Sequence, residues 1–401
     1  MCRFHDSEVE LLSRDGRRRR ALLQAGTALA AAPLAASMFA RTAQAQKTEQ
    51  PADTARSVQA WAAFDDSGDF APHTISRRAP GRNDVVIDIL YSSICHSDIH
   101  TVRADWGRPH YPVVPGHEMI GRVVATGADV VKFREGDTAG VGTMVDSCGV
   151  CAHCVADLEQ HCLNGATFTY DSPDPVSGGV TYGGYSKRIV VDEDYVLRIP
   201  PGLDLAGAAP LLCAGITTFS PLNTWHLEPG QRFAVIGMGG LGHLAVKLAA
   251  AKGAEVTVFT TSQDKLADAK RFGAAEAYLW SPEQGIDGRP GRFDLMLSTV
   301  PESYSMQPFL NMLTLGKTLV NVGALGPLEG PSGIMLSMGR QNLGGSLTGG
   351  IAETQRLIDF AAHKGIAAEY EMIAPSEITA ACQRVVDKQA RYRYVIDMSR
   401  A

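Results

Sequence analysis

Residues 233–260 read FAVIGMGGLGHLAVKLAAAKGAEVTVFT, and this stretch decides the fold of the chain. Residues 233–236 form a continuous apolar run, as in a strand that is buried on both faces. Residues 241–252 have the composition and spacing of a helix, and residues 255–260 predict a second strand. Two strands joined by a helix form a βαβ unit, so the sequence predicts an α/β fold with a doubly wound parallel sheet.

A glycine-rich turn of the form G-x-G-x-x-G joins the first strand to the helix. It consists of Gly237, Met238, Gly239, Gly240, Leu241 and Gly242. Glycines at these positions allow a tight turn, the close approach of a pyrophosphate and the packing of helix on strand. Alone, the motif could be a structural turn, but its place in a βαβ unit predicts dinucleotide binding.

The end of the second strand indicates which dinucleotide binds. An NAD-binding unit has Asp or Glu there to bond the ribose 2′-hydroxyl. This chain has Thr260, Thr261 and Ser262, followed by Lys265. Hydroxyls and an ammonium can receive a 2′-phosphate, which predicts NADP(H). In a competing interpretation Ser262 caps the following helix, and both roles can hold at once.

A chain of 401 residues exceeds the usual size of a single core, so we expect two domains. Hydrophobic residues make up 45% and charged residues 20%, as in ordinary globular proteins. The net charge of −6 gives no electrostatic footprint for nucleic acid. We expect a signal segment at 1–45, a β-rich catalytic domain at 46–212 and 345–401, and a cofactor-binding domain at 213–344.

The expected elements change in type at Pro200-Pro201-Gly202, a plausible hinge. Short strands are predicted before it and helices directly after it. The predicted strands are 84–91, 120–126, 138–142, 187–191 and 195–199, and the predicted helices are 205–218 and 220–227.

The first 45 residues resemble an export signal. A basic run at 17–20 precedes an Ala/Leu-rich stretch at 21–40, and Ala43-Gln44-Ala45 offers a cleavage site. The Arg19-Arg20 pair is similar to a bacterial twin-arginine signal, which predicts export to the periplasm. The alternatives are a membrane anchor, which Pro33 disfavours, and an extension without a targeting role in a cytoplasmic protein. After removal of the leader we expect no stable membrane insertion.

Four cysteines follow the spacing C-x2-C-x2-C-x7-C, at Cys148, Cys151, Cys154 and Cys162. Four thiolates suit a closed tetrahedral zinc site that stabilises a lobe too small for its own core. The spacing also resembles iron–sulfur ligation, but there the last cysteine follows after three residues and precedes Pro. The lobe is therefore predicted to hold a structural zinc.

A second group of ligand types lies between Cys95 and Glu118, where C-H-S-D-I-H is followed by P-G-H-E. Cys95 and His117 could supply two donors of a zinc site with an open position, which needs three. The spacing does not identify the third donor.

Together these motifs resemble the zinc-dependent medium-chain alcohol dehydrogenases, in particular the cinnamyl alcohol dehydrogenase type with its bacterial NADP-dependent aldehyde reductases. The similarity covers roughly 57–398 and includes G-H-E-x2-G-x5-G from residue 116, L-L-C-A-G-I-T-T at 211–218 and the four-cysteine lobe. It implies a β-rich GroES-like catalytic domain beside a Rossmann cofactor domain, two zinc ions per chain, and a homodimer.

The resemblance also implies roles for single residues. Cys213 would complete the catalytic zinc site with Cys95 and His117, Glu118 would be a nearby or transient ligand, and Asp98 would orient the His117 ring. Ser97 and His100 would carry the proton while hydride passes between the nicotinamide and the substrate carbon.

Further correspondences involve the cofactor and the substrate pocket. Thr299, Gly323 and Ser346 would lie near the ribose and nicotinamide. Trp106 would line the substrate pocket, although it could equally belong to the core.

The predicted reaction is hydride transfer between NADP(H) and a primary alcohol or aldehyde, mainly the reduction of aromatic and aliphatic aldehydes. Two alternatives stay open at this point: an NAD-linked or polyol dehydrogenase with the same fold, and a non-catalytic zinc protein that binds NADP.

Overall fold

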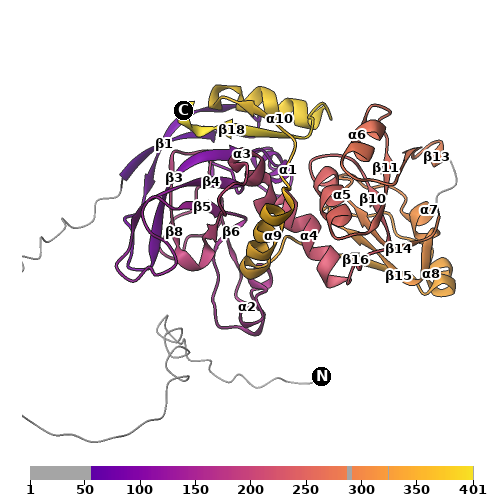
Figure 1. Cartoon of the computed structure of the whole chain (residues 1–401). Coiled ribbons are helices and arrows are strands. Elements are labelled where there is room, and N and C mark those ends of the chain that lie inside the picture. Colours follow the sequence, from indigo (N-terminus) through magenta and orange to yellow (C-terminus); the bar gives the residue numbers. More distant parts are fainter. Residues whose placement is uncertain (1–55, 287–290, 324, 401) are drawn as a thin grey trace, which may run out of the picture. The chain divides into compact units, whose positions relative to one another are not determined.

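The computed structural model describes residues 56–286, 291–323 and 325–400 (Figure 1). The predicted signal segment, 1–45, lies outside these ranges.

The first half of the described chain is rich in strands. One sheet has the order β17-β18-β3-β4-β5-β9, and β8 also pairs with β3. Two two-stranded ribbons, β1-β2 and the shorter β6-β7, accompany it. The bounds are β1 Arg56–Ala63, β2 Phe70–Arg77, β3 Asp84–Ser93, β4 Met119–Thr126, β5 Thr138–Val141, β6 Met144–Asp146, β7 Thr167–Phe168, β8 Arg188–Asp192, β9 Leu197–Arg198, β17 Tyr370–Ile373 and β18 Arg393–Asp397.

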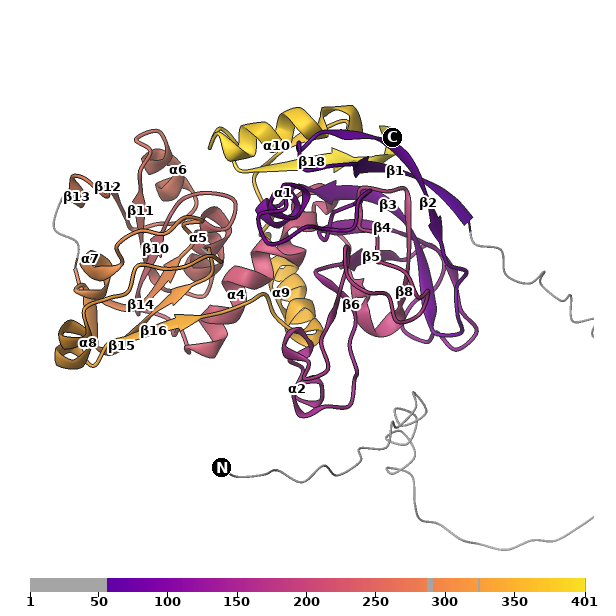
Figure 2. The ribbon, with the colours of Figure 1, turned by 180° about the vertical axis from the view of Figure 1, so that it is seen from behind.

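The C-terminal strands lie in this first sheet although they are last in the sequence. β18 pairs antiparallel with β3, Val395 opposite Ser93, and parallel with β17. In Figures 1 and 2 the yellow C-terminal segment accordingly lies beside the indigo N-terminal strands. The chain thus crosses to the second sheet and returns.

The second sheet is parallel except at one edge, with the order β13-β12-β11-β10-β14-β15-β16 and an antiparallel β12-β13 pair. Its strands are β10 Arg232–Ile236, β11 Glu255–Thr260, β12 Glu276–Ser281, β13 Gly285–Ile286, β14 Phe293–Ser298, β15 Leu313–Asn321 and β16 Asn342–Gly345. Counted along the chain from β10, the main order is 3-2-1-4-5-6, the doubly wound Rossmann order. The predicted α/β fold is confirmed, with the order of strands reversing between β10 and β14.

Most of the helices are short. They are α1 His96–Val102, α2 Ala152–Val155, α3 Leu205–Ala208, α4 Ala214–Thr224, α5 Gly242–Ala251, α6 Lys265–Arg271, α7 Gln307–Leu310, α8 Gly333–Gly339, α9 Ile351–Lys364 and α10 Ile378–Val386. Short 3₁₀ helices are η2 Glu159–His161, η3 Glu193–Tyr195, η4 Ala209–Leu212, η5 Pro375–Glu377 and η6 Met398–Arg400.

The predicted helices after the hinge were wrong in their boundaries. The sequence predicted a continuous helix over 205–218, but helical geometry is interrupted at Cys213, whose φ is −131° and ψ is −68°. The 3₁₀ helix η4 contains Pro210, which lacks a backbone N–H, and α4 begins only at Ala214. The break places the Cys213 backbone outside regular helix just where its thiol joins a cluster.

Within the described ranges, no single helix is long and apolar enough to cross a bilayer. The bent pair Leu205–Leu212 and Ala214–Thr224, with 56° between its halves, does meet the criteria of length and composition.

Candidate active site and metal clusters

The N-terminus of α1 fixes the position of Cys95. Cys95 is the residue that caps the helix, and its backbone is extended, with φ −114° and ψ 154°. Its N–H donates to Asp98 Oδ2 at 2.9 Å, so the carboxylate satisfies a backbone donor before the first turn. The sequence C-H-S-D therefore orients a thiol at the start of a helix.

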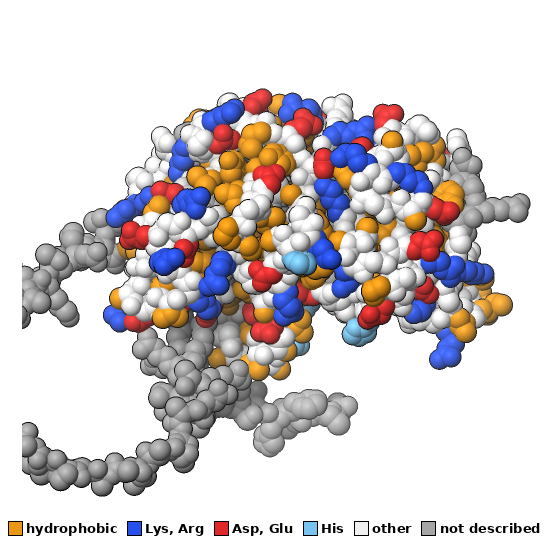
Figure 3. Space-filling model, viewed as in Figure 1, with side chains coloured by type: hydrophobic (Ala, Val, Ile, Leu, Met, Phe, Trp, Pro, Cys, Tyr) orange, Lys and Arg blue, Asp and Glu red, His pale blue; other side chains and the backbone are white. Residues whose placement is uncertain are grey.

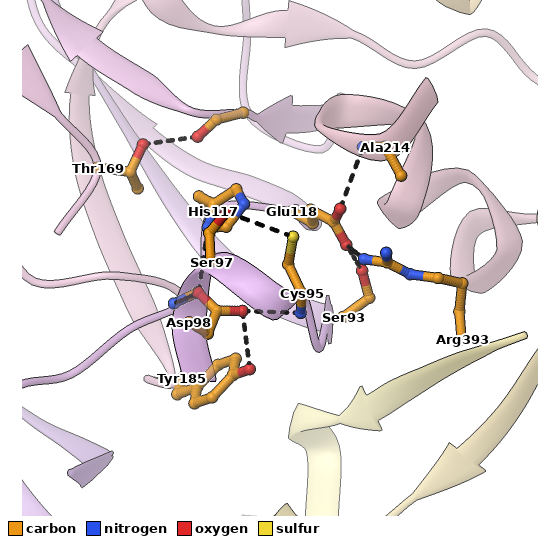
Figure 4. Close-up of polar contacts among 12 residues, drawn as sticks. Ser93, Cys95, Ser97, Asp98, His117, Glu118, Thr169, Tyr185, Ala214 and Arg393 are labelled. Atoms are coloured by element: carbon orange, nitrogen blue, oxygen red, sulfur yellow. Dashed lines mark hydrogen bonds and ion pairs between the residues drawn. The ribbon is translucent and has the colours of Figure 1, made fainter. Parts of the chain in front are cut away.

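Asp98 is fully buried and accepts four hydrogen bonds (Figure 4). Besides Cys95, the donors are Gly116 N at 3.0 Å, His117 Nδ1 at 3.1 Å and the Tyr185 hydroxyl at 3.0 Å. A buried carboxylate is tolerable only when its oxygens are paired in this way. With Nδ1 donating to Asp98, the other ring nitrogen, Nε2, is available to a metal.

Four ligand groups converge beside Asp98. Cys95, His117, Glu118 and Cys213 each offer one ligand atom, and these atoms all lie within 4.8 Å of one another. Two thiols, an imidazole and a carboxylate form the donor set of a zinc site with a replaceable ligand. The Cys213 thiol and the charge of His117 lower the pKa of Cys95 well below its ordinary value, against the effect of burial. The residues therefore fit zinc.

Glu118 is fully buried and has several partners of its own. It accepts hydrogen bonds from the Ser93 hydroxyl and from Ala214 N, the latter at 3.2 Å, and forms an ion pair with Arg393. Burial raises the pKa of Glu118 to about 7, and Arg393 opposes that rise. The Ala214 bond ties the β4 side of the site to the start of α4.

Arg393 connects this cluster to the glycine-rich turn. Its Nη2 pairs with Glu118, and its Nη1 lies 3.0 Å from where a Cβ on Gly240 would be. Its Nε is buried and has no partner among the described residues. The Arg393 side chain therefore spans the distance between the metal cluster and the glycine-rich turn.

Ser97 and His100 lie three residues apart on α1, one turn along the helix. Ser97 Oγ is 3.8 Å from Cys95 Sγ, next to the cluster. His100 is partly exposed, and its Nδ1 lies 2.7 Å from Asp105 Oδ2. Trp106 is 49% exposed with its ring 5.0 Å from that of His100, so it does not belong to the core.

The four cysteines of the lobe form the second cluster, with their sulfurs within 4.8 Å of one another. Backbone N–H groups of Cys154 and Leu163 lower the pKa of Cys151 to about 6, which favours its thiolate. Ser147 Oγ lies 3.2 Å from Cys154 Sγ. These thiols fit a closed structural zinc site.

The glycine-rich turn has the geometry that a pyrophosphate requires. Gly237 has φ +96°, and a Cβ there would lie 2.8 Å from Thr299 Oγ1. Gly242 packs against the Gly237 carbonyl, whereas a Cβ on Gly239 would meet only open space. Among the described residues no side chain caps the N-terminus of α5, which can therefore face a phosphate, although the His243 N–H already donates to Gly239 O at 3.1 Å.

The residues predicted to select NADP(H) lie at the end of β11 and the start of α6. Thr260 is buried, and its Oγ1 accepts the N–H of Ser262 at 3.3 Å. The expected cap was wrong: α6 starts at Lys265, with Asp264 and not Ser262 as its capping residue. Burial and the charge of Arg391 lower the pKa of Lys265. Thr261 is exposed.

Thr299, Gly323 and Ser346 each follow the carboxyl end of a strand, after β14, β15 and β16 respectively. The Thr299 hydroxyl donates to the carbonyls of Ile236 and Gly237, both at 3.1 Å. A Cβ on Gly323 would lie 2.4 Å from the Thr299 backbone. The strands are parallel, so all three residues share the sheet edge that carries Gly237.

Sequence patterns do not predict three residues of this site, Asp105, Tyr185 and Arg393. Tyr185 and Arg393 reach the cluster from β-rich segments far along the chain, so no local spacing relates them to it. Asp105 lies only five residues after His100, but a single exposed acid in a loop is common and carries no pattern.

Comparison with known families agrees with this geometry. Residues 81–201 match the description "Alcohol dehydrogenase GroES-like domain", and residues 240–363 match "Zinc-binding dehydrogenase". The chain belongs to the zinc-dependent medium-chain alcohol dehydrogenases. Within that family it falls in the cinnamyl alcohol dehydrogenase-like subgroup.

Individual relatives cover nearly all of the folded chain. NADP-dependent alcohol dehydrogenase C of Mycobacterium bovis is 49% identical over 343 residues, 85% of this chain and 99% of the relative. Aldehyde reductase YahK of Escherichia coli is 46% identical over 342 residues, 85% and 98% respectively. The crystal structure of CAD from Helicobacter pylori complexed with NADP(H) has a TM-score of 0.81 at 40% identity, covering 87% of this chain and 100% of that one.

Proposed function

We propose that the protein is an NADP(H)-dependent zinc alcohol dehydrogenase that acts mainly as a reductase of aromatic and aliphatic aldehydes. The observation that carries the proposal is the contact of Arg393 with both Glu118 and the Gly240 backbone region, because it brings a Cys2His cluster next to a dinucleotide turn. A hydride donor and a Lewis acid can act on one carbonyl only if their sites adjoin. The names of NADP-dependent alcohol dehydrogenase and aldehyde reductase relatives support the same reaction.

The metal cluster would hold the reacting oxygen. Cys95, His117 and Cys213 would hold a zinc ion, with Glu118 close enough to exchange as a ligand. Zinc, when bound, polarises a carbonyl oxygen or lowers the pKa of a bound alcohol. Asp98 holds the His117 ring, and Arg393 balances the Glu118 charge in a buried setting.

The proton would travel along α1. The Ser97 hydroxyl, beside Cys95, would exchange a proton with the oxygen, and His100, one turn on and partly exposed, would exchange it with water. With Nδ1–H directed at Asp105, the neutral His100 ring keeps Nε2 as its proton acceptor. Asp105 is thus a positioning residue for the relay.

The cofactor preference follows from the end of β11. Thr260, Thr261 and Ser262 offer hydroxyls, and Lys265 offers an ammonium, where an NAD-specific chain would present a carboxylate. The polyol alternative requires a different substrate loop. The NAD-linked alternative requires NADH to bind beside these hydroxyls and this ammonium. A relative rate with NADPH and NADH decides between the cofactors.

An NADPH-consumption assay over a panel of aldehydes tests the proposal. We expect turnover with NADPH, and its loss in His117→Ala, whereas the surface variant His363→Ala retains it. Full activity of His117→Ala would contradict the mechanism. A non-catalytic NADP-binding protein would bind NADPH without consuming it under any of these conditions.

We further propose two zinc ions per chain, one in each cluster. The four-cysteine donor set and the Cys2His set differ in chemistry, and both are compact. Metal analysis of the purified protein is expected to give two zincs per chain. A content of one zinc per chain would mean that only the four-cysteine cluster holds zinc.

A homodimer is proposed through the free edge of the second sheet. β16 ends that sheet, and the nearby α8 and its surroundings present exposed apolar side chains, seen at the surface near α8 in Figure 3. The most exposed are Leu315, Leu325, Ile334 and Met338. Sedimentation of the wild type and of Ile334→Asp/Met338→Asp tests this: we expect dimer and monomer, and a monomeric wild type would exclude the proposal.

We also propose export to the periplasm by the twin-arginine leader, with a cytoplasmic location as the alternative. Transport in the folded state would let the chain carry its metals and cofactor with it. Fusing residues 1–45 to a reporter that works only after export tests the proposal, with Arg19→Lys/Arg20→Lys as the matched control. Retention of the unaltered fusion in the cytoplasm would reject it.

A further inference from the structure

The segment 183–185 is attached to the chain directly before His117. Gly183 N donates to Val114 O at 2.7 Å, Gly184 N to Gly116 O at 2.9 Å, and Tyr185 N to Pro115 O at 3.0 Å. A Cβ on Gly116 would lie 2.7 Å from the Tyr185 ring, so the glycine, with φ +103°, allows close approach. The backbone that presents His117 is thus fixed by this segment.

The Tyr185 side chain reaches the other support of His117. Its ring is fully buried, and its hydroxyl donates to Asp98 Oδ2 at 3.0 Å. Cys95 N donates to the same oxygen, whereas His117 Nδ1 and Gly116 N donate to Oδ1. Two donors therefore hold one oxygen of the carboxylate, and the other oxygen receives the imidazole. Figure 4 shows Tyr185 on the far side of Asp98 from His117.

A role in core packing alone would not require this hydroxyl. The ring lies 5.8 Å from that of Phe70 and belongs to the main apolar cluster of the first sheet, which phenylalanine could join equally well. Hydrogen bonds to a charged group are stronger than neutral ones and fix direction as well as distance. Removing the hydroxyl would leave the plane of the Asp98 carboxylate held on that side by one backbone donor.

We propose that Tyr185 is a positioning residue that fixes the orientation of His117 for metal binding through Asp98. The inference rests on the proposed function, because it assumes that the Cys95–His117–Cys213 cluster binds zinc. It extends the site to a third layer of contacts, metal ligand to carboxylate to phenol, contributed by the loop between β7 and β8.

Tyr185→Phe tests the inference on the full-length protein. Changes in the groups that orient metal-binding histidines weaken metal binding by about 10–100-fold. We expect this variant to lose zinc from the Cys2His cluster to a chelator at least about 10-fold faster than the wild type. After replacement by Co²⁺, we also expect its visible absorption bands to shift, since these report the ligand geometry.

Tyr195→Phe is the matched control. Tyr195 is also buried, at 3% exposure, and its hydroxyl lies 2.7 Å from Ser147 Oγ beside the four-cysteine cluster. The Tyr195→Phe variant removes a buried tyrosine hydroxyl that does not contact Asp98, so the Cys2His cobalt spectrum should stay unchanged. If Tyr185→Phe alters metal release and spectrum no more than Tyr195→Phe does, the proposal is overturned.

A double variant checks the route of the effect. In an Asp98→Asn background, Tyr185→Phe should add little, because its partner carboxylate is already gone. An undiminished effect in that background would show that Tyr185 does not act through Asp98. Failure of the proposed function is distinguishable, since a wild type that binds metal only in the four-cysteine lobe would give no Cys2His cobalt spectrum at all.

Discussion

Two neighbouring carboxylates of the active site show how burial and pairing divide roles between residues. Asp98 and Glu118 are both inaccessible to water, yet Asp98 is held only by neutral donors and the His117 ring, whereas Glu118 is paired with Arg393. A buried charge of this kind contributes orientation more than stability, because its desolvation offsets much of the attraction. The two acids therefore serve to hold His117 and Arg393 in place.

Lys265→Ala tests the assignment of the 2′-phosphate site. Loss of a charged hydrogen bond costs about 1.5–3 kcal/mol, which corresponds to roughly 10–100-fold in affinity. We expect the Kd for NADPH, measured by fluorescence titration, to rise by that factor while the Kd for NADH hardly changes. Lys270→Ala on the same helix is the control. An equal loss for both cofactors would place Lys265 outside the 2′-phosphate site.

His243 predicts a pH dependence of stability. It is fully buried, its Nδ1 lies 3.2 Å from Gly239 O, and its Nε2 accepts Glu369 N–H at 3.2 Å. Burial, with Lys247 and Arg393, lowers the pKa of His243 to about 3. Below pH 6.5 the unfolded chain therefore binds a proton that the folded chain does not. The contribution of neutral His243 to the free energy of unfolding is thus complete above pH 6.5 and is lost as the pH falls toward 3.

Between pH 7 and pH 5 the free energy of unfolding falls by about 2 kcal/mol through His243. Urea unfolding of the wild type should show it, and His243→Asn, which has no titrating ring there, should lose about that much less over the same interval. His363→Asn, at an exposed position on α9, serves as the control. Parallel pH profiles for the wild type and His243→Asn would contradict the prediction.

At the scale of single residues, the sequence predicted the site residues that belong to a motif and missed those that come from distant segments of the chain. Cys95, His117 and the four lobe cysteines stand at informative spacings, so their chemistry could be inferred from residues alone. Cys213 required the family resemblance, because an isolated cysteine in an apolar run resembles a core residue. Tyr185 and Arg393 depend on the pairing of distant strands, which no local pattern encodes.

At the scale of elements, the βαβ unit was the most predictable part. The strand 255–260 matches β11, and the helix 241–252 matches α5 within a residue at each end. The boundaries failed where tertiary contacts override propensity. The apolar run 205–218 reads as one helix, but Pro210 and the convergence of Cys213 on the cluster divide it. The cap of α6 likewise moved from Ser262 to Asp264.

The four-cysteine lobe carries a prediction at this scale. Between Cys148 and Cys162 the described chain has only one turn of α-helix and one of 3₁₀ helix, too little to bury a core. The lobe also supplies Glu159, which accepts Ile351 N–H at 3.1 Å at the start of α9. Cys148→Ala should therefore reduce the zinc content from two per chain to one and lower the Tm.

Cys382→Ala is the control for that variant, because Cys382 is a buried cysteine outside both clusters. It should leave both zincs in place. Metal analysis and a thermal melt measure both effects. Two zincs retained by Cys148→Ala would mean that the lobe does not bind metal through four thiolates.

At the scale of the whole molecule, the chain assembles the site by crossing between two sheets and returning. Cys95 lies just after β3 and His117 just before β4, both strands of the first sheet. Cys213 lies where the chain leaves that sheet, and Arg393 begins β18, the second of the two strands with which the chain returns to it. The path of the chain between the two sheets therefore brings the metal cluster close to the dinucleotide turn, and a side chain also contacts both. Hydride transfer is the reaction that such an arrangement favours.

Transfer of deuterium from NADPH labelled at the reactive C4 position tests this central claim most directly. Mass spectrometry of the alcohol formed from benzaldehyde should find one deuterium on the former carbonyl carbon with the zinc-loaded wild type. No labelled alcohol should form with His117→Ala, which lacks the metal ligand but keeps the cofactor turn. Unlabelled alcohol from the wild type, or undiminished label with His117→Ala, would contradict the account.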